Sequence, residues 1–198
     1  MSSSGAVQKS QDSKAKYTST LTGTVKNTVA TPLQKYNGLD NVWIVNTNGI
    51  VTFSATDYSN FKNLTEPRTY IIEGGDLKIT DAIISDVNLA FVVKGGNIII
   101  DKEVKELKGT FIAIPVAGVG GKIKSNGDTD VQLVVTGSLY GDIAELVDAR
   151  HYIEKSNNAS GMLGVGTIVS FGSSIFHKPA PLIGQFIAEY LDTTKVAK

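Results

Sequence analysis

The two histidines are the first residues to test for chemistry, because imidazole titrates near neutral pH and serves as a general base or a metal ligand. Neither His151 nor His177 has a second histidine or a cysteine at metal-ligand spacing. A 21-residue register, described below, places Asp130 beside His151, where a carboxylate can orient an imidazole. No Gly-x-Ser-x-Gly elbow supplies a nucleophile. We therefore expect no catalytic residues, and interpret His151 as a hydrogen-bonded surface residue.

The carboxylates do not form the acidic cluster typical of carbohydrate-active β-helices. In the same register Asp76 lies over Asn97, and Asp128 lies over Ala149. The segment 126–130 resembles a calcium-loop fragment, with oxygen-bearing residues at alternate positions, but it lacks the bidentate glutamate downstream and predicts a turn. No phosphate-binding or dinucleotide-binding glycine motif occurs. The sequence therefore predicts no cofactor and no metal site.

Composition excludes several classes of function. The 198 residues are 41% hydrophobic, which is enough for a substantial core. Nineteen Lys and Arg balance nineteen Asp and Glu, so no basic field favours a nucleic-acid partner. The chain has no cysteine, residues 1–17 lack the apolar region of a signal peptide, and no apolar run reaches the roughly 18 residues of a membrane span. We expect a folded chain without a transmembrane segment.

A repeat of 21 residues dominates the middle of the chain. Gly74, Gly95 and Gly137 follow similar apolar runs and are separated by 21 and twice 21 residues. Residues 69–152 divide into four coils of this length, and each coil opens with a largely apolar tetrad: 69–72, 90–93, 111–114 and 132–135. Self-similarity at this period is typical of stacked architectures. We predict a mainly β protein built as a parallel β-solenoid of about four 21-residue coils.

Paired residues support the register of the first two coils. Glu73 falls against Lys94 with opposite charge, Asp81 falls against Lys102 in the same way, and Tyr70 falls against Phe91 as one step of an aromatic ladder. Gly-Gly pairs at 74–75 and 95–96 predict sharp corners between two strands. In the third coil Pro115 and Val116 stand where the first two coils have a polar residue and glycine, and the glycines come later in the sequence. This delay indicates an insertion of two or three residues.

The chain divides into three parts. Residues 1–16 are polar and predict a flexible arm. Residues 17–178 predict the β-solenoid domain, which includes an amino-terminal β segment with strands at 18–29, 42–45 and 50–53 and a short β run at 164–171. Residues 179–198 predict an amphipathic helix and tail.

The helix carries one apolar stripe directly after Pro181, a residue that favours helix starts. The spacing of the stripe is helical. One interpretation is a cover over an exposed apolar end or flank of the solenoid; the other is an arm that docks into a neighbouring copy. The candidate interaction residues are Leu182, Ile183, Phe186, Ile187, Tyr190 and Leu191.

Four segments of the chain carry a resemblance to known proteins: 70–79, 89–101 and 132–142 in the repeat, and the ending 164–197. They resemble the carboxy-terminal region of large uncharacterised secreted or cell-surface proteins of candidate-phyla bacteria. The resemblance covers about residue 41 to the end. It implies an extracellular or cell-surface location and a structural role, and supplies no catalytic residue. The resemblance also implies a signal peptide, which this chain lacks. The difference indicates that an export sequence or a larger amino-terminal part is absent here. Segment 137–143 is also similar to the coil consensus of bactofilins, β-solenoids that polymerise end to end in the cytoplasm.

Together these features predict a non-enzymatic structural or interaction protein of the cell surface that self-assembles as a homo-oligomer or polymer. The uncovered strand edge of an open solenoid end favours pairing with another copy. The alternative is a carbohydrate-binding or carbohydrate-degrading β-helix module with a surface glycan as partner. Exposed Asp and Tyr side chains that converge in space would favour this second function. The alternative location, implied by the bactofilin resemblance, is cytoplasmic.

Overall fold

The computed structural model describes residues 34–54, 64–151, 153–154, 162–172 and 177–196. The predicted arm at 1–16 and the predicted strand at 18–29 lie outside these residues. Within them the protein is mainly β, with a carboxy-terminal helix, and this coarse prediction is confirmed. The domain limits at 16/17 and 178/179 stay predictions.

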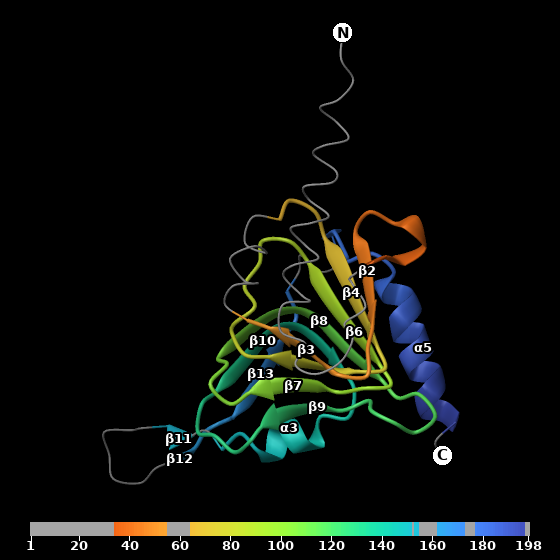
Figure 1. Ribbon diagram of the computed structural model, residues 1–198. Coiled ribbons are helices and arrows are strands. Elements are labelled where there is room, and N and C mark those ends of the chain that lie inside the picture. The colour runs from red at the N-terminus through yellow and green to blue at the C-terminus, as the bar shows by residue number, and fades with distance from the viewer. Residues whose placement is uncertain (1–33, 55–63, 152, 155–161, 173–176, 197–198) are drawn as a thin grey trace.

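Two sheets of largely parallel strands face each other across one core (Figure 1). The larger sheet has the order β1-β2-β4-β6-β8-β10-β13, and β1 alone runs antiparallel to its neighbour. The smaller sheet has the order β3-β5-β7-β9, all parallel. Successive strands alternate between the sheets from β2 to β10. The strands of the larger sheet are β1 (Gln34–Lys35), β2 (Val42–Asn46), β4 (Arg68–Glu73), β6 (Leu89–Lys94), β8 (Glu106–Ile114), β10 (Leu133–Tyr140) and β13 (Thr167–Ser170).

The remaining elements complete the chain. The smaller sheet contains β3 (Ile50–Phe53), β5 (Asp76–Ile79), β7 (Ile98–Asp101) and β9 (Ile123–Asn126). A 3-10 turn, η1 (Tyr36–Gly38), follows β1, and a two-strand ribbon joins β11 (Ile153–Glu154) to β12 (Met162–Leu163). The helices are α3 (Ala144–Asp148) and α5 (Ile183–Val196). The sequence predictions at 42–45, 50–53 and 164–171 are confirmed by β2, β3 and β13.

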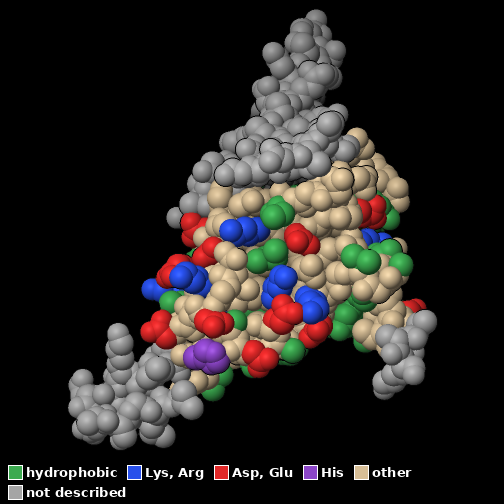
Figure 2. Space-filling view, turned by 60° about the horizontal axis from the view of Figure 1, so that its bottom comes forward, with side chains coloured by type: hydrophobic (Ala, Val, Ile, Leu, Met, Phe, Trp, Pro, Cys, Tyr) green, Lys and Arg blue, Asp and Glu red, His purple; other side chains and the backbone are tan. Residues whose placement is uncertain are grey.

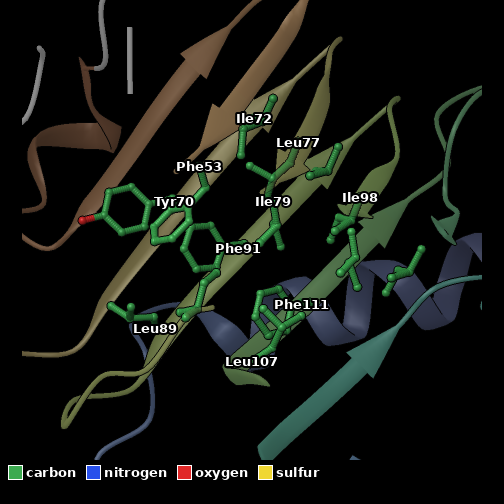
Figure 3. Close-up of a cluster of buried hydrophobic side chains, with 14 of the residues drawn as sticks. Phe53, Tyr70, Ile72, Leu77, Ile79, Leu89, Phe91, Ile98, Leu107 and Phe111 are labelled. Atoms are coloured by element: carbon green, nitrogen blue, oxygen red, sulfur yellow. The ribbon is translucent and has the colours of Figure 1, made fainter. Parts of the chain in front are cut away.

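Side chains between the sheets form a dry core, as the alternation of apolar residues along the strands requires. Tyr70, Phe91 and Phe111 stack from strand to strand, with ring centroids 5.5 and 5.6 Å apart, and Phe53 meets Phe91 edge-on at 5.9 Å (Figure 3). The predicted ladder of Tyr70 and Phe91 is confirmed, and it lies inside the molecule. Each ring is fully or almost fully buried, so the ladder fixes the register of successive strands.

The regular period of 21 residues holds for only part of the repeat. Tyr70 pairs with Phe91 at a spacing of 21, Phe91 pairs with Phe111 at 20, and Phe111 pairs with Leu139 at 28. The prediction of four equal coils is therefore wrong. Gly137 pairs with Gly109 and is not equivalent to Gly95.

The longer third turn has a visible cause. A tight reversal at 116–119, closed by hydrogen bonds between Val116 and Val119, inserts residues after β8, which confirms the predicted insertion. The insertion is longer than the predicted two or three residues, because Ile98 pairs with Ile123 at a spacing of 25 and not 21. The chain also takes a longer path from β9 to β10 through 127–132. Core side chains still find partners, because strand registry depends on which residues face inward and tolerates different loop lengths.

Polar contacts confirm part of the predicted register. Glu73 lies opposite Lys94, with 4.0 Å between Oε1 and Nζ. The second expected charge pair does not form: Asp81 accepts a hydrogen bond from the backbone N–H of Ala82, and the opposite-sign contact near that level joins Lys78 to Asp101 at 4.0 Å.

A polar ladder follows the corner of the small sheet. The backbone and side-chain N–H groups of Asn97 donate to Asp76 Oδ1 at 2.7 and 3.2 Å. Asn97 Oδ1 in turn accepts from the backbone N–H of Lys122 at 3.2 Å. The predicted stacking of Asp76 on Asn97 is confirmed, and its role is to satisfy backbone donors at the turn.

Candidate interaction surfaces

Helix α5 lies along the outer face of the larger sheet (Figure 1). It begins two residues after Pro181, and the hydroxyl of Thr69 donates to the carbonyl of Pro181 at 2.5 Å, which ties the helix start to β4. The predicted helix after Pro181 is confirmed. Its position covers a sheet face that would otherwise expose apolar side chains.

The apolar stripe of α5 packs on its own chain. Phe186 is 1% exposed and contacts a cluster of sheet residues: Val42, Ile71, Val92, Ile112 and Ile114. Leu182, Ile183, Ile187 and Tyr190 are partly buried against the same cluster, while Leu191 is 48% exposed. Of the six candidate interaction residues, five thus pack within the chain and one faces solvent.

Lys94, the last residue of β6, forms an ion pair with helix α5. Its Nζ lies 2.7 Å from Glu189 Oε1 on α5 and 4.0 Å from Glu73 Oε1 on β4, and 5.7 Å from the ring centre of Phe186. One cation therefore bridges two elements and contacts an aromatic face. Glu73, Lys94, Glu189 and Val116 line a shallow hollow of about 420 Å³ at this position.

The end of the stack at β13 has a strand edge with no further strand beside it among the described residues. Strand β13 pairs with β10 along one side and is the last strand of the larger sheet among the described residues. Exposed apolar side chains surround it: Val165 (63%), Ile168 (39%), Val169 (43%) and Phe171 (71%). An apolar edge of this kind is a template for pairing with another chain.

Helix α3 covers the last strand of the smaller sheet at the same end (Figure 1). Lys122 Nζ donates to Glu145 Oε1 at 2.6 Å, and this hydrogen bond and charge lower the pKa of Glu145 and raise the pKa of Lys122. Several carboxylates are exposed on this end: Asp128, Asp130, Asp142, Glu145 and Asp148. Figure 2, turned to bring this side forward, shows acidic side chains interspersed with basic ones.

Arg150 is the buried polar residue that the sequence reasoning missed. It is 3% exposed, and its guanidinium donates to the carbonyls of Asp101, Val104 and Val131 at 3.0 to 3.2 Å. Burial lowers the pKa of Arg150, and the charges of Asp101 and Glu103 oppose that shift. The arginine joins three turns at the end of the core, which is a structural role. The predicted 21-residue register places Arg150 beside Thr129, and this placement was the one signal in the sequence that could have located the arginine.

His151 and His177 lie in different parts of the structure and have different neighbours. Thr129 pairs with Arg150, so the predicted neighbourhood of Asp130 and His151 is confirmed by the backbone, and His151 N–H donates to the Thr129 carbonyl at 2.8 Å. His177 is exposed and lines a hollow of about 490 Å³ with Asp86 and Lys178 among its neighbours.

No group of three or more His, Asp or Glu side chains with the geometry to hold a metal ion occurs among the described residues. The calcium-like segment 126–130 starts at the last residue of β9 and continues through bends at 127 and 130, with Thr129 in a parallel bridge to Arg150. Its first residue, Asn126, donates its side-chain amide to Asp101 Oδ2 at 3.3 Å.

Comparison with family models, with curated proteins and with solved structures finds no match in any of the three. The resemblances to secreted proteins and to bactofilins therefore stay expectations. Within the parts of the chain that are described, no helix has the length and apolar character needed to cross a bilayer.

Proposed function

We propose that this chain is a non-enzymatic structural protein whose two-sheet stack is a parallel β-solenoid that self-associates through an end. The observation that carries the proposal is the β13 edge, which has exposed apolar residues and no further strand beside it in the part of the chain that the structure describes. Unpaired backbone groups on a strand edge gain hydrogen bonds when a second chain adds to them. A cell-surface location follows from the resemblance and belongs to the same proposal.

The alternation of strands supports the solenoid. From β2 to β9 each turn of the chain contributes one strand to each sheet, and equivalent strands pair in parallel. In the next turn α3 replaces the strand of the smaller sheet. A stack of this kind grows along one axis, so its natural contacts are at its ends.

The sheet face offers a weaker contact than the stack end. Helix α5 already covers that face with Phe186, so docking α5 into a neighbouring copy would first require its release from its own sheet. The end at β13 requires no such release. We therefore assign self-association to the end.

The glycan-binding alternative requires exposed tyrosines near carboxylates. The tyrosines among the described residues are Tyr36, Tyr70, Tyr140 and Tyr190, and none of these is exposed. Tyr140 and Tyr190 meet edge-on at 6.1 Å between β10 and α5, where they pack as part of the sheet–helix contact. This arrangement favours the scaffold over a sugar-stacking platform.

The proposal is tested by light scattering and negative-stain electron microscopy of the full chain over a concentration series. We expect the mass to rise with concentration above that of the 21.0 kDa chain and ordered particles to appear. A chain that stays monomeric at every concentration and binds oligosaccharides on a glycan array would overturn the proposal in favour of the alternative.

A further inference from the structure

Strand β13 is the feature of the described residues that most needs a partner. It is short, parallel to β10, and exposed at three of its four positions. Edge strands are usually protected by being short, by charge or proline within them, or by a covering segment. Residues 167–170 read Thr-Ile-Val-Ser, so they contain no charge and no proline, and among the described residues no further strand pairs with their outer edge.

A segment outside the described residues has the sequence of a matching strand. Between Thr18 and Val29 the even positions carry threonine at five of six places, and the odd positions include Leu21, Val25 and Val29. Threonine on one face and aliphatic residues on the other is the two-residue period of a β-strand. We call 18–29 the donor segment and β13 the acceptor edge.

We infer that the acceptor edge binds the donor segment of a second copy of this chain, adding it as a further strand to the larger sheet. This inference rests on the proposed self-association and names the surfaces that make it. Backbone hydrogen bonds supply affinity in this mode of recognition, and alternate side chains supply specificity. Val165, Ile168, Val169 and Phe171 supply exposed apolar surface around the edge.

The length of the linking chain limits how far the donor segment reaches within its own molecule. The donor segment ends at Val29, and Gln34 begins β1, so at most five residue steps, or about 18 Å, separate the segment from the first strand of the sheet. From β1 to β13 the sheet has six strand intervals, which at about 4.8 Å each amount to about 29 Å. Val29 therefore does not reach the acceptor edge of its own chain, and we assign the donor segment to the edge of a second copy.

Charge favours the same pairing. Residues 1–33 carry four lysines and one aspartate. The stretch 122–151, at the end that bears the acceptor edge, carries five exposed carboxylates against Lys122, Lys124 and the buried Arg150. A basic amino-terminal part therefore meets an acidic end, whereas two copies of that acidic end would repel each other. Head-to-tail contacts of this kind continue from copy to copy and produce a filament.

Two single substitutions test the donor segment and the acceptor edge separately. Val25→Pro removes a backbone donor from the donor segment, and Ser10→Pro is its control outside the segment. Val169→Lys places a charge on the acceptor edge, and Val147→Lys is its control, because Val147 is 51% exposed on α3 at the same end. We expect Val25→Pro and Val169→Lys each to be monomeric by light scattering, and both controls to assemble like the parent chain.

The decisive experiment mixes the two monomeric variants. One retains the acceptor edge and the other retains the donor segment, so the mixture forms a single junction. We expect a species of twice the 21.0 kDa chain mass and nothing larger. A synthetic peptide of residues 17–31 should bind the Val25→Pro protein and bind Val169→Lys at least about tenfold more weakly.

Several results would overturn the inference. Unchanged assembly of both variants excludes this pairing while leaving self-association intact. Dimers formed by Val25→Pro alone indicate that two acceptor edges pair with each other. A loss of monomer stability in Val25→Pro, without peptide binding, assigns the segment to its own chain. A parent chain that stays monomeric at every concentration refutes both the proposed self-association and this pairing between copies, whether or not the free peptide binds.

Discussion

At the scale of single residues, backbone contacts at the corners set the tightest limits. A Cβ added to Gly96 would lie 2.0 Å from the carbonyl oxygen of Gly75, and one added to Gly75 would lie 2.3 Å from that of Gly49. These distances are far inside van der Waals contact, so the corner glycines allow neighbouring turns to stack. A side chain here forces two layers of both sheets apart.

We therefore expect Gly96→Ala to lower the free energy of unfolding by at least about 2 kcal/mol. The matched control is Gly184→Ala in α5, where a Cβ meets nothing within 4 Å. That change should be neutral or stabilise the protein by up to about 1 kcal/mol, because alanine favours helices over glycine. Urea unfolding followed by circular dichroism measures both. Equal stability of the two variants would contradict the corner argument.

Arg150 is the second residue with a specific expected effect. Arg150→Met keeps the length of the side chain and leaves the carbonyls of Asp101, Val104 and Val131 without their donors. We expect a loss of about 3 kcal/mol in the free energy of unfolding, because buried acceptors without partners are costly. Arg150→Lys should lose less, since an ammonium retains the charge but lacks the planar fork of donors. A Met variant as stable as the parent would exclude the anchoring role.

At the scale of elements, α5 stabilises the larger sheet by covering it. The helix contributes Phe186 to a cluster with residues from β2, β4, β6 and β8, so one element holds four strands together. The salt bridge from Lys94 to Glu189 adds a partly exposed polar contact. The face of the helix that includes Leu191 has no such role.

Phe186→Ala should lower the free energy of unfolding by about 3 kcal/mol, since it removes a fully buried ring. Leu191→Ala, at the 48% exposed position on the same helix, should change it by less than about 1 kcal/mol. Denaturant unfolding at low protein concentration measures the monomer. If Phe186→Ala left monomer stability unchanged and abolished assembly instead, the helix would dock in a neighbouring copy.

At the scale of the whole molecule, the two ends of the stack differ in kind. The β1 end leads into an amino-terminal part with a net positive charge, and the β13 end presents an open strand edge beside exposed carboxylates. The proposed self-association is therefore expected to be directional, because ends of opposite charge attract each other and ends of like charge repel.

Assembly should therefore weaken with added salt. Raising the ionic strength from 0.1 M to 1 M shortens the Debye length from about 10 Å to about 3 Å and screens the attraction between the ends. We expect the concentration needed for half-maximal assembly to rise by about tenfold, measured by light scattering. Assembly that strengthens with salt would instead indicate a contact dominated by apolar burial, as between two β13 edges.

The sequence by itself determined the local elements and the first two coils. Strands at 42–45 and 50–53, the Gly-Gly corners and the helix after Pro181 follow from periodicity and glycine or proline chemistry within a few residues. The pairing of Tyr70 with Phe91 and of Glu73 with Lys94 also followed, because every residue of β4 pairs with the residue 21 positions later in β6, the spacing that the repeat predicts.

Only the tertiary structure decided the later registers and the surfaces. The spacings of 20 and 28 residues around Phe111 depend on which side chains fill the closed core, and a fixed period cannot supply that information. The burial of Arg150, the sheet face that α5 covers and the open edge at β13 likewise depend on segments far apart in the chain. The physical reason is that loops of different length can bring the same strands together, so packing, and not local pattern, selects the partners.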